Sequence, residues 1–129
     1  MSTWKSFEEI EAWQLAREFS KDIYGLMENT SLKNDYKLKD QINGSSGSIM
    51  DNISEGFERN GNKEFIQFLF IAKASAGESR SQLYRIVDRN YISQEEFQVL
   101  REKVLLVSKK IQALINYLGN SDYKGPKYK

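Results

Sequence analysis

Apolar residues recur at intervals of three and four along four stretches of the chain, a spacing typical of one face of an amphipathic α-helix. We therefore predict four helices, over residues 6–29, 36–56, 62–89 and 93–119. Their connections are short, so helices adjacent in the sequence should be antiparallel neighbours in space. The expected fold class is all-α, an antiparallel up-and-down four-helix bundle of residues 1–119, followed by a flexible basic tail of residues 120–129.

Short polar motifs mark the helix ends. Residues 6–9 and 93–96 both have the Ser-x-x-Glu form of a capping box, in which two side chains bond free backbone N–H groups at a helix start. We expect Asn62 to be the N-cap of the third helix and Gly56 to be the C-cap of the second. In the first helix, the expected core stripe consists of Ile10, Trp13, Ala16, Ser20, Ile23 and Met27.

The middle of the second helix is unusually small, with the run Gly44, Ser45, Ser46, Gly47 and Ser48. A glycine inside a helix costs roughly 1 kcal/mol relative to alanine. Close approach of a neighbouring helix is the usual compensation in a bundle, and the middle of the third helix is small as well. We therefore predict close contact between the second and third helices.

The third and fourth helices carry more apolar residues than one core stripe needs. Residues 65–72 and 104–107 place large apolar groups all round the helix axis, and such a helix needs a second partner to bury them. The pattern predicts a homo-oligomer, with candidate interface residues Ile66, Phe70, Leu105 and Leu106. A wide core face with a few exposed residues is the alternative interpretation.

Composition narrows the possible chemistry. The sequence contains no Cys, which excludes disulfides and thiolate nucleophiles, and no His, which removes the commonest general base and metal ligand. We expect no enzymatic activity, no cofactor, no metal site and no small-molecule substrate. The longest apolar run, residues 68–72, is far shorter than the ~20 residues that span a bilayer. The expected location is therefore the cytoplasm, without membrane association.

Charge is unevenly distributed along the chain. The first sixty residues carry 7 basic and 11 acidic side chains, whereas the remaining residues carry 12 basic and 7 acidic ones. Such asymmetry favours either complementary self-association or an anionic partner such as RNA or DNA. The candidate nucleic-acid contacts are Arg80, Arg85, Arg89, Lys103, Lys109, Lys110, Lys124 and Lys127. A solvated charged face is the alternative, because acidic residues lie between these positions.

The densest polar motif lies at the end of the second helix and consists of Asp51, Asn52, Glu55, Glu58 and Arg59. Two carboxylates one turn apart, such as Asp51 and Glu55, can hold a divalent cation weakly or perform acid–base chemistry. With the third helix, the candidate polar cluster comprises Asn52, Glu55, Arg59, Ser75 and Glu78. The structural interpretation is that Asn52 and Glu55 hydrogen-bond across to the third helix, while Arg59 or Arg80 neutralises a carboxylate.

Two blocks in the middle of the chain resemble a known family. Residues 52–56, Asn-Ile-Ser-Glu-Gly, followed by Arg59, are similar to its Asn-Ile-Ala-Glu-Gly-x-x-Arg motif. Residues 68–78 resemble its second block, Phe-Leu-x-Ile-Ala-x-x-Ser-x-x-Glu. This is the four helix bundle protein family, also called the 23S rRNA intervening-sequence protein family, and the resemblance extends over roughly residues 7–118.

The resemblance implies an up-down four-helix bundle that is commonly a homopentamer. Members are encoded within insertions in bacterial large-subunit rRNA genes or as free-standing genes, and no enzymatic activity is established for them. A related accessory protein of diversity-generating retroelements is a basic pentamer that binds nucleic acid. This sequence has Asn43 and Gly44 where a basic pair is common, Met50 where proline is common and Ser54 where alanine is usual.

The predicted function is that of a non-catalytic, homopentameric scaffold or interaction protein whose partner is a second copy of itself. The alternative is an accessory protein that binds RNA or DNA through a basic face of the oligomer. The resemblance favours both, whereas the apolar surplus in the third and fourth helices favours the first.

Overall fold

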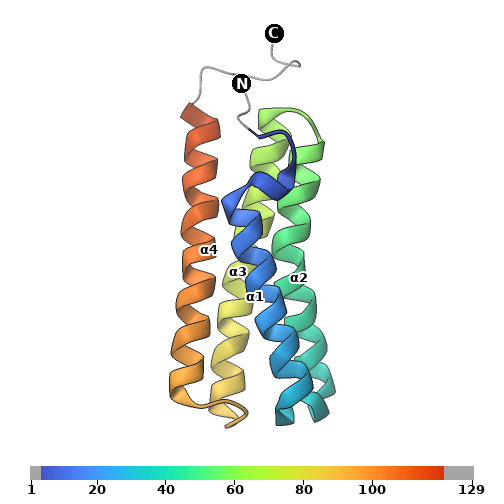
Figure 1. Cartoon of the computed structure of the whole chain (residues 1–129), viewed down its shortest axis with the longest axis vertical. Helices are drawn as coiled ribbons and strands as arrows, with labels where there is room; N and C mark the ends of the chain where they lie inside the picture. Colours follow the sequence, from blue (N-terminus) through green and yellow to red (C-terminus); the bar gives the residue numbers. More distant parts are fainter. Residues whose placement is uncertain (1–3, 121–129) are drawn as a thin grey trace.

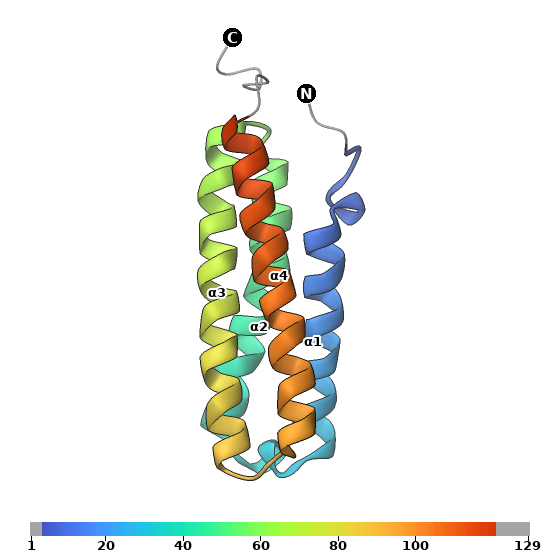
Figure 2. The same cartoon turned by 90° about the vertical axis from the view of Figure 1, so that its left-hand side faces the viewer.

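A computed structural model of the chain describes residues 4–120. These residues form four long helices, α1 (Glu11–Asn29), α2 (Tyr36–Glu58), α3 (Asn62–Asp88) and α4 (Gln94–Asn120). Two short 3-10 helices, η1 (Phe7–Glu9) and η2 (Ser31–Asn34), precede α1 and α2. The four helices lie side by side along one long axis, and each runs opposite to the next in the sequence (Figures 1 and 2). The predicted all-α, up-and-down four-helix bundle is confirmed.

One end of the bundle, uppermost in Figure 1, holds both ends of the described chain and the turn between α2 and α3. The other end holds η2 and the connection between α3 and α4. The predicted basic tail, with its candidate contacts Lys124 and Lys127, lies outside the described residues. Between residues 4 and 120, none of the helices combines the length and the apolar character that a membrane span requires.

Apolar stripes at helical spacing build the core. The apolar residues that recur at intervals of three and four in α2, α3 and α4 are buried, and large residues such as Ile49, Leu69 and Ile111 are completely enclosed. The stripe expected for α1 was partly wrong, because Ala12 and Phe19 are buried while Trp13 and Ser20 are only half-buried. Ala12, Ala16, Phe19, Ile23 and Met27 also recur at three and four, along a line rotated slightly from the predicted one.

The two predicted capping boxes have different outcomes. At the start of α4, Ser93 Oγ accepts a hydrogen bond from the Glu96 N–H at 3.1 Å, and a Glu96 carboxylate oxygen accepts one from the Ser93 N–H at 2.9 Å. The box predicted at Ser6 is wrong, because Ile10 has extended backbone (ψ 121°) and separates η1 from α1. The Glu9 carboxylate instead accepts the Lys5 N–H at 3.1 Å.

Gly56 is not a C-cap, because α2 continues past it to Glu58. A Cβ atom at Gly56 would lie 2.6 Å from the Cβ of Phe68 in α3, so this position admits only glycine without a shift of backbone. The expectation that Gly44 and Gly47 serve the same purpose is wrong, since a Cβ at either would meet nothing within 4 Å. Close contact between α2 and α3 is confirmed, and Gly56 and the serines provide it.

The start of α3 also differs from its prediction. Gly61 is the N-cap, and Asn62 is the first residue of the helix. The Asn62 amide reaches across the top of the bundle, where Nδ2 donates a hydrogen bond to the Leu118 carbonyl at 3.3 Å. The side chain therefore ties the α2–α3 turn to the end of α4.

At the lower end, one carboxylate joins the two connections. Asp35, the N-cap of α2, accepts hydrogen bonds from Arg89 at 2.6 Å and from the Tyr91 hydroxyl at 2.9 Å. The bonds from Tyr91 and Arg89 hold the pKa of the Asp35 carboxyl below its usual value. The same hydrogen bond raises the pKa of Tyr91, because it favours the protonated phenol.

Candidate interaction surfaces

Part of the predicted polar cluster lies in the interface between α2 and α3. Asn52 Nδ2 donates hydrogen bonds to the carbonyl and the hydroxyl oxygen of Ser48, both at 2.8 Å. Ser75 Oγ donates to Ser48 Oγ at 3.0 Å. Asn52 is therefore linked to α3 by way of Ser48, which hydrogen-bonds to both Asn52 and Ser75. Ser48 was not among the predicted site residues.

A second polar group, buried deeper in the same interface, was missed by sequence reasoning. Ser45 Oγ donates to Gln82 Oε1 at 2.6 Å and lies 2.8 Å from Ser79 Oγ. Gln82 Nε2 donates in turn to Glu78 at 3.2 Å. Gln82 is only 5% exposed, and its spacing of seven from Ser75 along the buried stripe was the available signal.

Glu55 and Arg59 lie on the surface of α2 and do not join this network. Their side chains form an ion pair of 3.0 Å within one helix, and each is more than half exposed. The guanidinium of Arg59 also lies 4.9 Å from the centre of the Phe68 ring. An exposed pair one turn apart contributes well under about 1 kcal/mol, so it positions Arg59 over the ring more than it stabilises the fold.

The residues of the predicted cluster therefore lie in three different environments. Asn52 and Ser75 hold two helices together, Glu78 accepts a hydrogen bond at the edge, and Glu55 faces its own Arg59. No group of three or more metal-ligating acidic side chains occurs within residues 4–120. The hydrogen bonds of Asn52 and Ser75 fix the position of α2 against α3.

Large apolar side chains remain exposed on α3 and α4. Of the four candidate interface residues, Phe70 is 52% and Leu106 is 44% exposed, whereas Ile66 and Leu105 are half-buried. Sequence reasoning missed Val99 and Ile71, which are 55% and 49% exposed. These side chains lie outside the buried core, so they form apolar surface that a single chain leaves in water.

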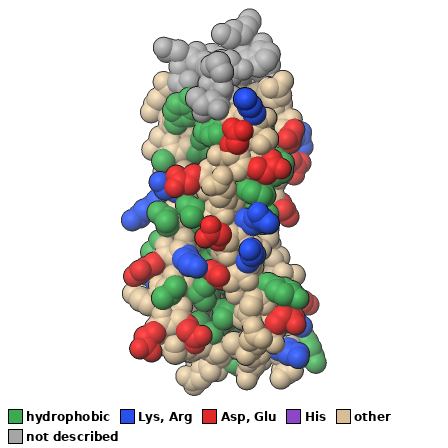
Figure 3. All heavy atoms as spheres, viewed as in Figure 1, with side chains coloured by type: hydrophobic (Ala, Val, Ile, Leu, Met, Phe, Trp, Pro, Cys, Tyr) green, Lys and Arg blue, Asp and Glu red, His purple; other side chains and the backbone are tan. Residues whose placement is uncertain are grey.

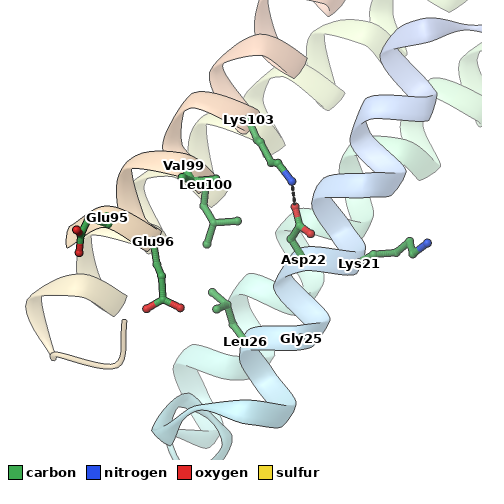
Figure 4. A pocket seen from close by; sticks show the side chains of 9 residues that line it. All are labelled: Lys21, Asp22, Gly25, Leu26, Glu95, Glu96, Val99, Leu100 and Lys103. Carbon is green, nitrogen blue, oxygen red and sulfur yellow. Dashed lines mark hydrogen bonds and ion pairs between the residues drawn. The ribbon is translucent and has the colours of Figure 1, made fainter. Parts of the chain in front are cut away.

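The surface where α1 and α4 meet, here called the α1–α4 seam, contains two grooves. The lower groove, of about 500 Å³, is lined by Leu26 of α1 and by Val99 and Leu100 of α4. Figure 4 shows Leu26 and Leu100 pointing towards one another across it. An ion pair of 2.6 Å between Asp22 and Lys103 closes one end.

The upper groove, of about 450 Å³, lies further along the same seam. Its apolar lining includes Ile10, Ala12 and Leu114, with Ala113 and Tyr117 on the side of α4. An ion pair of 3.1 Å between Lys110 and Glu11 crosses the seam here. Figure 3 shows the same face, on which apolar side chains alternate with charged ones of both signs.

The comparison with known proteins decides the family. Residues 8–113 match the profile of a family described as 23S rRNA-intervening sequence protein. The chain belongs to this family. A crystal structure of a protein of unknown function from the S23 ribosomal protein family of Bacteroides thetaiotaomicron has a TM-score of 0.74 to this chain, with 26% sequence identity. The alignment covers 81% of this chain and 95% of that one. No functionally curated protein matches the chain.

In this member of the intervening-sequence protein family, several of the candidate nucleic-acid contacts already have partners within the chain. Arg89, Lys103 and Lys110 each pair with a carboxylate of α1 or of the residue before α2. Arg85 donates a hydrogen bond to Gln41 of α2. Neutralised and dispersed cations attract phosphate less than a row of free ones. Nucleic-acid binding through the eight candidate residues stays a prediction.

Proposed function

We propose that this protein is a non-catalytic scaffold that assembles with copies of itself, with five copies as the expected number. The observation that carries the proposal is the large apolar side chains left exposed on α3 and α4, with Phe70, Val99 and Leu106 about half in water. Covering the exposed half of one such side chain contributes roughly 1 kcal/mol, so several together favour association.

The use of the polar residues supports a structural role. Ser45 hydrogen-bonds to both Gln82 and Ser79 in the interface between α2 and α3, and Asn52 hydrogen-bonds to Ser48 beside them. A general base or nucleophile needs an open position next to its reactive atom. These side chains instead hydrogen-bond to other side chains of the same interface. Polar groups buried between two helices need such partners.

Size-exclusion chromatography with light scattering tests the proposal. Wild-type protein at micromolar concentration should have about five times the chain mass of 15.0 kDa. Phe70→Lys should lower this mass, because the ammonium group cannot be buried cheaply. Tyr36→Lys is the matched control, since Tyr36 is 69% exposed and lies on α2. A wild-type monomer at every concentration would contradict the proposal.

A further inference from the structure

We infer that self-association joins two unlike faces, so that the outer face of α3 in one copy docks on the α1–α4 seam of the next. The inference rests on the proposed self-association and adds the surfaces that meet. Three observations carry it: a pattern of large and small side chains, the heights at which they lie, and the charge around them.

The outer face of α3 carries a stripe with a residue every two turns, formed by Phe70, Gly77 and Tyr84. Phe70 and Tyr84 are 52% and 44% exposed, and a Cβ at Gly77 would meet nothing within 4 Å. The Tyr84 ring packs edge-on against Phe97 of α4 at 4.8 Å, which places the stripe on the side of α3 next to α4. The stripe therefore presents two aromatic projections with an open position between them.

The seam carries the opposite pattern at the same spacing. Val99, Leu106 and Ala113 of α4 also follow one another every two turns. Val99 lines the lower groove and Ala113 the upper one. Leu106 stands between the grooves and is 44% exposed. Val99 is itself 55% exposed and borders the lower groove, in which Leu26 and Leu100 lie beside it. The seam thus presents two grooves separated by Leu106, which complements the two aromatic side chains and the open glycine of the stripe on α3.

The two patterns lie at matching heights along the bundle. Lys73 of α3 donates a hydrogen bond to Gln112 of α4, which sets the antiparallel register of the two helices. Tyr84 contacts Phe97 and Arg101 of α4, about three turns further down. With a rise of about 1.5 Å per residue, this register puts the stripe of Phe70, Gly77 and Tyr84 level with Ala113, Leu106 and Val99.

A rotation about an axis parallel to the bundle preserves these heights. In a neighbouring copy generated in this way, Phe70 meets the upper groove, Tyr84 meets the lower groove, and Gly77 leaves room for Leu106. Such packing of projections into hollows is what two helices need for close contact. If the α3 stripe instead met itself in an antiparallel pair, Gly77 would face Gly77 and both grooves would stay open.

Charge favours the same pairing. The positions that flank the stripe towards α4 are Lys73 and Arg80, both basic. The two grooves are lined by five carboxylates and three lysines, and within residues 4–120 Glu95 and Glu96 of the lower groove form no ion pair with these lysines. A basic face against a face with excess carboxylate is attractive, whereas either face against itself is not. A contact between unlike faces repeats from copy to copy and closes into a ring when the rotation allows.

Disulfide trapping tests which faces meet, because the chain has no cysteine of its own. Oxidised Gly77→Cys/Leu106→Cys protein should give bands at multiples of 15.0 kDa on a denaturing, non-reducing gel. Gly44→Cys/Leu106→Cys is the matched control. Gly44 is also open, and it lies at nearly the same height because its neighbour Ser45 contacts Ser79. The control should stay a single band.

A second variant, Gly77→Leu, removes the open position and should weaken self-association at least tenfold, measured as the dilution at which the assembly dissociates. Gly44→Leu should leave that dilution unchanged. If the wild type assembles but the Gly77 and Leu106 cysteines do not cross-link, or Gly77→Leu assembles normally, the inference is overturned while the proposed scaffold survives. If the wild type is a monomer, both fall together.

Discussion

The α2–α3 interface and the α1–α4 seam belong to one bundle but are built from opposite kinds of residue. Between α2 and α3, Gly56 lets the backbones approach and the serines bond to one another, so contact is the most extensive of any helix pair. Between α1 and α4, contact is the least extensive of the four neighbouring pairs, and two apolar grooves remain. On the proposed self-association, the first interface completes the monomer, whereas the second is the surface that a neighbouring copy would cover.

The largest expected effect comes from filling the tightest point of the α2–α3 interface. Gly56→Val places side-chain atoms against Phe68 Cβ, which cannot move without its backbone, and should lower the free energy of unfolding by about 3 kcal/mol. Urea denaturation measures the loss. Gly44→Ala is the control and should raise the free energy of unfolding by roughly 0.5–1 kcal/mol, because its Cβ meets nothing. Equal effects at the two sites would refute the close approach at Gly56.

The second-largest effect is expected from a change to the polar group buried in the same interface. Ser45→Ala removes the hydroxyl that serves both Gln82 and Ser79, and should cost about 1–2 kcal/mol because Gln82 Oε1 is left without its donor. Urea denaturation again gives the value. Ser54→Ala is the control, since that hydroxyl bonds only to the carbonyl of Asp51 on the exposed side of α2. A cost at Ser45 no greater than at Ser54 would mean that the network contributes nothing to stability.

Breaking an ion pair on the α1–α4 seam should lower the free energy of unfolding by less than either change in the α2–α3 interface. Asp22→Asn removes the partner of Lys103, in a pair whose side chains are 34% and 45% exposed. Water screens such a pair, so the free energy of unfolding should fall by less than about 1 kcal/mol. Thermal unfolding at low and high salt checks this, because salt should remove most of the difference. A loss as large as that of Gly56→Val would mean that the seam holds the monomer together.

The smallest effect is a dependence on pH at the lower end of the bundle. The folded pKa of Asp35 is lowered, so its contribution to stability is complete above about pH 4 and is lost as the pH falls through the folded value. The folded pKa of Tyr91 is raised, so its contribution is complete below about pH 10 and is lost above the folded value. Asp35→Asn should flatten the acid limb of a plot of stability against pH. If the variant lost stability at acid pH as steeply as the wild type, that loss would come from carboxylates other than Asp35.

Sequence reasoning succeeded where periodicity alone decides the structure. The stripes of α2, α3 and α4 predicted the core, and the Ser93 box predicted the start of α4. At Ser6 the same motif failed because the chain turns at Ile10, whose apolar side chain is buried and whose extended backbone ends η1. A motif specifies which bonds are available, whereas packing of the neighbouring residue decides whether a helix follows.

The candidate site was harder to predict, for a related reason. Gly44, Gly47 and Gly56 look alike in the sequence, yet only Gly56 faces α3 closely, because the rotation of α2 about its axis decides which glycine meets a neighbour. The apolar surplus was visible in the sequence. Its division into a stripe on α3 and grooves on the seam requires the register of α3 against α4, which rests on contacts such as that between Lys73 and Gln112.

The most direct test of the account is a native mass spectrum of the unmodified protein, purified without nuclease and recorded with its ratio of absorbance at 260 and 280 nm. The account predicts one closed assembly of about five 15.0 kDa chains with the absorbance of protein alone. A monomer at micromolar concentration would contradict it, because the exposed side chains of α3 and the grooves of the α1–α4 seam would then have no partner in a second copy.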